Sequence, residues 1–153
     1  VEVQHIAKKE MTYIRSSQRP ISRGVPQGSV LGPVIFILFT NDLPSHISPY
    51  GRSFMYADDT VVVSDNKSLE VLEVDSFIAL NNALEYCHNN DLVFNEDKTK
   101  QLMFGSQKNN IVGLPNLKTN NSTLHLGVVI DDGLTWREHV DSLCHRLNNY
   151  FRN

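Results

Sequence analysis

Two neighbouring aspartates, Asp58 and Asp59, interrupt an otherwise apolar stretch that reads FMYADDTVVVSD over residues 54–65. In a β-strand, successive side chains point to opposite faces, so adjacent carboxylates cannot both enter one core. At the tight turn of a hairpin, both can reach the same rim. A divalent cation would offset their repulsion there, because Mg²⁺ prefers hard oxygen ligands together with water and substrate phosphates. Two such ions, about 4 Å apart, support phosphoryl transfer.

The pair also has a plainer interpretation, because Asp is a common turn residue. A polar hairpin turn without any chemical role would explain Asp58-Asp59 taken alone. Three further motifs accompany the pair and bear on the choice. They are GVPQGSVLGP at 24–33, NEDKTKQLMF at 95–104 and LGVVIDDGLTW at 126–136.

The elements in the first half of the chain, around GVPQGSVLGP and the aspartate pair, are predicted from the spacing of apolar residues and from the Gly and Pro residues that break regular structure. Residues 30–43 are predicted to form a mostly buried helix, with Ser29 as its N-cap and its end before Pro44. Residues 34–39 are expected in the core. The other elements expected in this half are a strand at 1–5, a hairpin or loop at 6–23, and two strands at 53–57 and 60–64 that meet at the aspartates.

The second half is predicted to hold two amphipathic helices, at 69–88 and 136–152, because apolar residues recur there at helical spacing. Between them we expect a turn at 95–98, a strand at 100–104, a short strand near Leu117 and a strand at 124–130. This order of elements predicts an α+β fold with helices on one face of an antiparallel sheet.

Composition excludes several classes of protein. The 153 residues are 41% hydrophobic and 20% charged, which is ordinary for one globular domain. Cys87 and Cys144 have no second Cys at ligand spacing, so neither a disulfide framework nor a zinc site is expected, and both are predicted to be small core residues. The longest apolar run, VIFILF at 34–39, is far shorter than the roughly 20 residues of a membrane span. No membrane partner is expected. Two cysteines without a disulfide framework fit a reducing compartment, and we expect an intracellular location, cytoplasmic or nuclear.

Charge is distributed unevenly along the chain. Residues 1–52 hold six Lys/Arg against three acids, and residues 53–153 hold eight against fourteen. A mildly basic binding surface beside an acidic site fits this division, and so does chance clustering. The candidates for phosphate contact are Arg15, Arg19 and Arg23, and a solvated loop without a binding role explains them equally well.

Taken together and in this order, the four motifs resemble the reverse transcriptases of non-LTR retrotransposons, the LINE-like elements of animals, of the Jockey and CR1 type. YADD at 56–59 resembles the family's catalytic box, and GVPQGSVLGPVIFILFTNDLP its glycine-rich box and following helix. FNEDKTKQLMF resembles its N-x-x-K-T box, and LGVVIDDGLTWREHV the box near the junction of palm and thumb. The resemblance covers nearly the whole chain. Because the chain starts at Val1 in strand-like sequence, we expect it to be a segment of a longer protein.

This resemblance implies the fold and the domain organisation. Residues 1–130 would form part of a polymerase palm, a ferredoxin-like antiparallel sheet with helices on one face, incomplete at the N-terminus. Residues 131–153 would begin the connection to the thumb. The implied partners are an RNA template, a DNA primer, deoxynucleoside triphosphates, and the fingers and thumb segments of the same polyprotein.

The resemblance also implies roles for individual residues. Asp58 and Asp59 would be catalytic carboxylates that bind Mg²⁺, and Lys98 would lie near the leaving pyrophosphate, where a cation offsets developing charge. Substrate-binding residues would be Tyr56, Ala57, Gln27, Gly28, Leu126 and Gly127. Plainer roles compete for several of these: strand packing for Tyr56, a solvated turn for Lys98, and a helix-entry turn for Gln27 and Gly28. Asp131, Asp132 and Trp136 are expected in turn, cap and core roles.

One departure from the family is important. A two-metal polymerase uses a third carboxylate on a strand beside the YADD hairpin, upstream of the glycine-rich box. The acids before Asp42 are Glu2 and Glu10, and neither lies in a matching context. We therefore expect residues 1–153 alone to be unable to polymerise.

Two other functions compete with a polymerase palm. A truncated or domesticated remnant would fold and bind at most a partner or nucleic acid, without chemistry. A small ferredoxin-like RNA-binding module would present aromatic residues on exposed strand positions. Phe54, Tyr56 and Phe104 are available for that role, but without the matching motif.

Overall fold

The computed structural model describes residues 2–7, 10–15, 17, 24 and 28–151. The chain divides into two compact units, residues 1–39 and 40–153. The first holds strands β1 (Glu2–Ala7) and β2 (Glu10–Arg15) and helix α1 (Leu31–Phe39). β1 and β2 pair antiparallel, from Glu2 with Arg15 to Ala7 with Glu10. The strand predicted at 1–5 is confirmed, and β2 lies in the segment where a hairpin or loop was expected.

Helix α1 begins after a side-chain cap. The Ser29 hydroxyl accepts a hydrogen bond from the Gly32 N–H at 3.0 Å, as an N-cap does. The core position expected for residues 34–39 is wrong, because their side chains are exposed except for half-buried Phe36, and only Gly32 of this helix is buried. A helix that is apolar all round needs cover on every side, and the described residues do not provide it.

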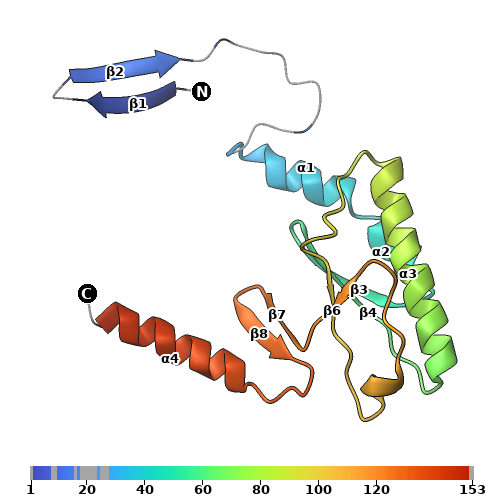
Figure 1. The fold of residues 1–153 in the computed structure, drawn as a ribbon. Helices are drawn as coiled ribbons and strands as arrows, with labels where there is room; N and C mark the ends of the chain where they lie inside the picture. Colours follow the sequence, from blue (N-terminus) through green and yellow to red (C-terminus); the bar gives the residue numbers. More distant parts are fainter. Residues whose placement is uncertain (1, 8–9, 16, 18–23, 25–27, 152–153) are drawn as a thin grey trace. The chain divides into compact units, whose positions relative to one another are not determined.

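The second unit is built on a helix pair and a hairpin. Helices α2 (Leu43–Ile47) and α3 (Leu69–Asn89) lie side by side, and strands β3 (Arg52–Tyr56) and β4 (Asp59–Val63) pair antiparallel (Figure 1). Among the described residues, the buried hydrophobic core consists of Leu43, Ile47, Ala79 and Tyr86. Half-buried Met55 of β3 packs against this core, so α2 and α3 cover one face of the hairpin.

The prediction of a single helix over 30–43 is wrong. A turn at residues 40–42 separates α1 from α2, with hydrogen bonds from the Leu43 N–H to the Thr40 carbonyl and from the Ser45 N–H to the Asp42 carbonyl. Pro44 lies in the first turn of the second helix instead of following the end of the first. Proline suits the first turn of a helix, because its fixed φ matches and its missing N–H is not needed there.

The rest of the unit carries short strands and one long helix. β5 (Lys100–Gln101) pairs parallel with β6 (Lys118–Thr119), and a 3-10 turn, η1 (Lys108–Asn110), lies between them in sequence. β7 (Ser122–His125) and β8 (Val128–Asp131) pair antiparallel and lead into α4 (Arg137–Phe151). The strand predicted at 100–104 is therefore only two residues long, and the strand predicted at 124–130 is a hairpin.

The described strands form four two-stranded sheets, which together with the helices make a mixed α+β fold. The predictions of helices at 69–88 and 136–152 and of a short strand near Leu117 are confirmed. Cys87 is half-buried, whereas Cys144 is exposed, so the core role expected for Cys144 is wrong. Within the described residues, no helix is both long and apolar enough to cross a membrane.

Candidate active site

The β3–β4 hairpin brings Asp58 and Asp59 to its tip. Tyr56 pairs with Asp59, which leaves Ala57 and Asp58 as a two-residue loop. Ala57 has a φ of +52°, in the left-handed region. Two-residue hairpin loops require positive φ at their first central position, because only then does the turn match the twist of the strands. The sequence here supplies alanine instead of glycine, so the tip holds backbone strain directly beside the carboxylates.

The two faces of this hairpin differ. Ser53 and Met55 are half-buried on the face toward the helices, and their neighbours Phe54 and Tyr56 are 59% and 67% exposed on the opposite face. Cross-strand partners share a face of a sheet, so Asp59 lies on the open face with Tyr56. One side of the hairpin is thus anchored to α2 and α3, and the other side presents an aromatic ring and a carboxylate to solvent.

Both carboxylates at the tip are exposed and unneutralised. Within the described part of the chain, neither side chain forms a hydrogen bond or an ion pair. At the opposite end of the same hairpin, Asp65 accepts from the Arg52 guanidinium at 3.1 Å. The tip is therefore the part of the hairpin where negative charge remains available to a cation.

These residues fit a divalent cation in the type of their donor atoms. Carboxylate oxygens are the ligands that Mg²⁺ prefers, and that ion keeps several waters of its own. Among the described residues, however, no group of three or more His, Cys, Asp or Glu side chains is placed to hold a metal ion. The remaining ligands at this tip would have to come from water or from a substrate phosphate.

Lys98 lies at the end of a turn that Asn95 organises. The Asn95 side chain accepts from the Lys98 N–H at 3.0 Å, and the Asn95 carbonyl accepts from the Thr99 N–H at 3.1 Å. The predicted turn at 95–98 is thus confirmed. The Lys98 side chain is exposed and, among the described residues, has no ion-pair partner. Its ammonium group is free to approach a phosphate.

Leu126 and Gly127 form the tip of the β7–β8 hairpin. His125 pairs with Val128, and both loop residues have positive φ, +48° and +83°. Positive φ at both positions is the pattern of a type I′ turn. Helix α4 is tied to this hairpin, because the Val129 N–H donates to His139 Nδ1 at 3.3 Å.

The remaining predicted site residues belong to the first unit. Gln27 lies outside the described residues. Gly28 is exposed and has a φ of +82°, a conformation that glycine adopts readily.

Asp131 stabilises the turn before α4. Its carboxylate accepts from the N–H groups of Gly133, Thr135 and Trp136, at 2.9–3.1 Å. The hydrogen bond from Thr135, with those from Trp136 and Gly133, holds the pKa of this carboxyl below its usual value, although burial opposes the shift. The turn and cap role expected of Asp131 is confirmed, whereas Trp136 is half exposed and does not occupy a core position.

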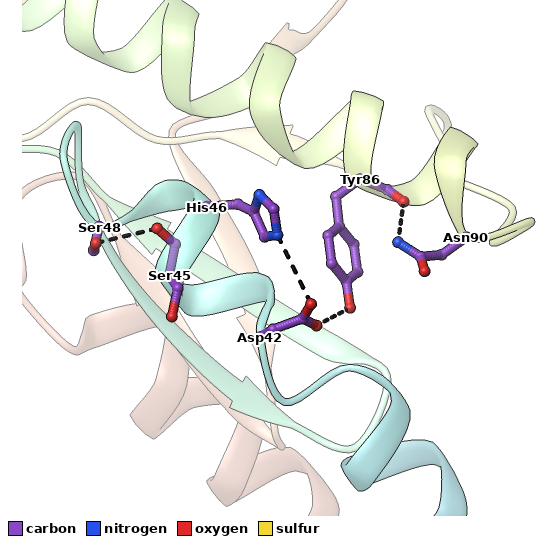
Figure 2. A network of polar contacts seen from close by, with 6 residues as sticks. All are labelled: Asp42, Ser45, His46, Ser48, Tyr86 and Asn90. Atoms are coloured by element: carbon purple, nitrogen blue, oxygen red, sulfur yellow. Dashed lines mark hydrogen bonds and ion pairs between the residues drawn. The ribbon is translucent and has the colours of Figure 1, made fainter.

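A polar link between α2 and α3 was not predicted from the sequence. The buried Tyr86 hydroxyl donates to the Asp42 carboxylate at 2.5 Å, and His46 lies 3.8 Å from the same carboxylate (Figure 2). Burial, followed by the contact with Asp42, raises the pKa of Tyr86 to about 12. The hydrogen bond from Tyr86 lowers the pKa of Asp42. The NDLP sequence at 41–44 placed an acid at a helix start, but nothing local indicated a partner 44 residues away.

Comparison with known proteins identifies the family. Residues 3–142 match the family described as reverse transcriptase (RNA-dependent DNA polymerase), and the chain therefore belongs to this family.

Similar proteins come from mobile elements of flies. The chain is 34% identical to the RNA-directed DNA polymerase from mobile element jockey of Drosophila funebris, over 86% of the chain and 15% of that relative. It is 27% identical to the jockey polymerase of Drosophila melanogaster, over 84% of the chain and 15% of the relative. It is 28% identical to the probable RNA-directed DNA polymerase from transposon X-element of Drosophila melanogaster, over 86% of the chain and 15% of that relative.

The chain thus spans about 15% of the length of these relatives. The resemblance to reverse transcriptases of Jockey-type non-LTR retrotransposons is confirmed. No solved structure gives a significant match.

Proposed function

We propose that this chain is the palm segment of an RNA-directed DNA polymerase that copies the RNA of a non-LTR retrotransposon into DNA. Asp58 and Asp59 bind Mg²⁺ against the phosphates of a deoxynucleoside triphosphate, with Asp58 the more critical of the two. A pair of such ions, if held there, would supply Lewis-acid chemistry for phosphoryl transfer at the primer 3′-hydroxyl and the leaving oxygen.

One observation carries the proposal: two unneutralised carboxylates lie at the tip of a hairpin whose opposite face is packed on helices. A reacting group must be held in position while its substrate approaches from solvent. The contact of Met55 with the core fixes the hairpin, and the exposed face that bears Tyr56 and Asp59 leaves room for a nucleic-acid strand.

Other residues position the substrates in this proposal. Tyr56 and Ala57 shape the site beside the primer end, and Leu126 and Gly127 hold the primer strand through the exposed β7–β8 turn. Lys98 approaches the leaving pyrophosphate, where its charge offsets that of the transition state. Gln27 and Gly28 contact the incoming nucleotide and the template.

In the same proposal, residues 1–130 belong to a palm with a ferredoxin-like antiparallel sheet, and residues 131–153 begin the connection to the thumb. The fingers and thumb segments come from the same polyprotein, as the greater length of the relatives suggests. The enzyme works inside the cell, in the cytoplasm or the nucleus, where its RNA template and DNA target are found.

The described residues do not bring a third metal-binding side chain to the aspartate tip. Two carboxylates alone would hold metal weakly, so residues 1–153 by themselves are expected to be inactive. The same observation favours a second candidate, a catalytically inactive remnant that at most binds a partner.

Mg²⁺-dependent primer extension on an RNA template separates these candidates. The polypeptide to test carries residues 1–153 in place of the matching segment of the Drosophila funebris jockey polymerase, because the chain spans only 15% of that relative. We expect extension by this chimera and a loss of at least about a hundredfold in Asp58→Asn, as for removal of one stabilising group from an active site.

Asp65→Asn is the matched control, because it removes the same charge from the far end of the same hairpin. It should extend the primer as the parent chimera does. Equal activity in Asp58→Asn and Asp65→Asn would refute the assigned site. Incorporation by residues 1–153 alone, lost in Asp58→Ala, would refute the expected inactivity of the isolated chain.

A further inference from the structure

Two lysines lie side by side on the β5–β6 strand pair. Lys100 and Lys118 are directly paired in the parallel register, and both are exposed. Neighbouring strands are about 4.8 Å apart, and paired residues project from the same face of the sheet. The two lysine side chains therefore project into solvent side by side, from the same face of the strand pair.

No acid neutralises this lysine pair in the described part of the chain. Neither side chain forms an ion pair or a hydrogen bond there. Lys108, which precedes β6 in sequence, lies 2.7 Å from the Asp132 carboxylate instead. Like charges directly opposite one another on adjacent strands are destabilising, so Lys100 and Lys118 are a cost to the free protein that an anion would remove.

The backbone under the lysine pair is held by other residues. The Gln101 side chain accepts from the Leu114 N–H at 2.8 Å, and the Asn120 N–H donates to the Gln101 carbonyl at 2.9 Å. The strand pair thus does not depend on the lysine side chains. Lys98, two residues before Lys100, adds a third exposed cation next to the pair in sequence.

We infer that Lys100 and Lys118 bind the phosphate backbone of a nucleic-acid strand. Ammonium groups on flexible stems act as point charges and suit singly charged phosphodiesters. A metal-bound triphosphate is a poorer match, because the pair brings no carboxylate to share the metal. The inference rests on the proposed function, since it adds a backbone contact outside the aspartate tip.

Binding of a fluorescently labelled single-stranded RNA of about 15 nucleotides to residues 1–153 tests the inference. Fluorescence anisotropy is measured in EDTA across a range of salt concentrations, so that metal binding at Asp58 and Asp59 cannot contribute. For Lys118→Gln and Lys100→Gln, we expect affinities about threefold lower, and a salt dependence reduced by about 0.7 in log–log slope for each lysine. The urea midpoint of each variant should be equal to or above that of the parent, because a repulsion is relieved.

Two controls remove the same charge elsewhere. Lys67→Gln alters an exposed lysine in the loop between β4 and α3 and should leave affinity and slope unchanged. Lys108→Gln breaks the ion pair with Asp132 and should lower the urea midpoint without a matching change in slope.

The inference is overturned if the parent chain does not bind the RNA, or if Lys67→Gln weakens binding as much as Lys118→Gln does. It is also overturned if a free deoxynucleoside triphosphate competes for the pair as well as an unlabelled oligonucleotide at equal phosphate concentration. Failure of the proposed function is a separate result: Asp58→Asn would leave primer extension unchanged, whatever the outcome in EDTA.

Discussion

Ala57 combines a side chain that disfavours left-handed backbone with a φ of +52° at the loop next to Asp58. For an L-residue this conformation costs roughly 1–2 kcal/mol, because the Cβ approaches a carbonyl oxygen. Strain of this kind persists where the surrounding structure determines the conformation, and it is found at functional sites. The pairing of β3 with β4 and the packing of Met55 are what hold it here.

Relief of this strain can be measured. Ala57→Gly should increase the free energy of unfolding by about 0.5–1 kcal/mol, since the strain relieved exceeds the extra entropy that glycine loses on folding. Gly127→Ala is the reciprocal change. Its added Cβ meets no atom within 4 Å, so the expected loss of about 1 kcal/mol comes from the backbone alone. Urea unfolding of both variants checks this, and a less stable Ala57→Gly would contradict a strained tip.

At the residue scale, the candidate site could be predicted from the sequence where its chemistry follows from residue type. Adjacent aspartates flanked by strand-like runs predict a hairpin tip, and the register of Tyr56 with Asp59 agrees. The sequence was insufficient where backbone conformation matters. Alanine at position 57 and leucine at position 126 gave no sign of positive φ, because turn prediction depends on Gly, Asn and Asp at such positions.

At the scale of elements, the Asp42–Tyr86 hydrogen bond joins the N-cap residue of α2 to the last turns of α3. The same pair of helices covers the face of the hairpin that bears Met55. Helix α2 has only five residues, which is too short to be stable alone, so its position depends on tertiary contacts of this kind. Tyr86 thereby supports the hairpin without touching the aspartate tip.

Tyr86→Phe tests this support. It removes the hydroxyl but keeps the ring, so we expect a loss of about 1–2 kcal/mol in the free energy of unfolding. The pKa of Tyr86 is raised from 10.0 to about 12 in the folded chain, so the folded state holds this proton more tightly than the unfolded state does. The contribution of the Tyr86 hydroxyl to the free energy of unfolding is therefore fully present below pH 10 and is lost as the pH rises toward 12.

Urea unfolding of the parent and the variant between pH 8 and pH 12 provides the readout, and the decline above pH 10 should be shallower in Tyr86→Phe. Tyr56→Phe is the matched control, because Tyr56 is exposed and its hydroxyl has no partner among the described residues. An identical pH dependence in the parent and both variants would contradict the proposed role of Tyr86.

The errors in the predicted elements have a common physical cause. The continuous apolar runs at 34–39 and 124–130 indicate that these segments tend to be buried, but they do not indicate where the chain turns. The turn at Asn41-Asp42 comes soon after the first run, and the turn at Leu126-Gly127 lies inside the second. Long periodic helices such as α3 and α4 were predictable, because many residues repeat one pattern and no single position decides the result.

At the scale of the whole molecule, the second unit depends on a small core. Its buried hydrophobic residues, within the described chain, are Leu43, Ile47, Ala79 and Tyr86. Helix α4 buries none of its side chains, although its apolar residues recur at helical spacing. Hydrophobic burial is the main term that opposes conformational entropy, so a small core indicates a free energy of unfolding at or below the lower end of the usual range, about 5 kcal/mol.

Ile47→Ala is the sharpest test of that conclusion, because Ile47 is fully buried, at 0% exposure, and contributes the largest side chain of that kind. Truncation of a buried Ile to Ala costs about 2–5 kcal/mol, from lost transfer energy and from the cavity left behind. Set against a stability near 5 kcal/mol, this loss leaves about 0–3 kcal/mol, so the urea midpoint should fall by about two fifths or more. At the upper end of the loss, a large fraction of the chain unfolds at 25 °C and the ¹H–¹⁵N correlation spectrum loses its dispersion. Val93→Ala removes apolar atoms from a side chain that is 95% exposed and should leave the spectrum dispersed. If Ile47→Ala instead retains a dispersed spectrum and the parent's urea midpoint, then the α2–α3 core does not determine the stability of the unit, and the hairpin that carries Asp58 must be held by contacts other than those of Met55.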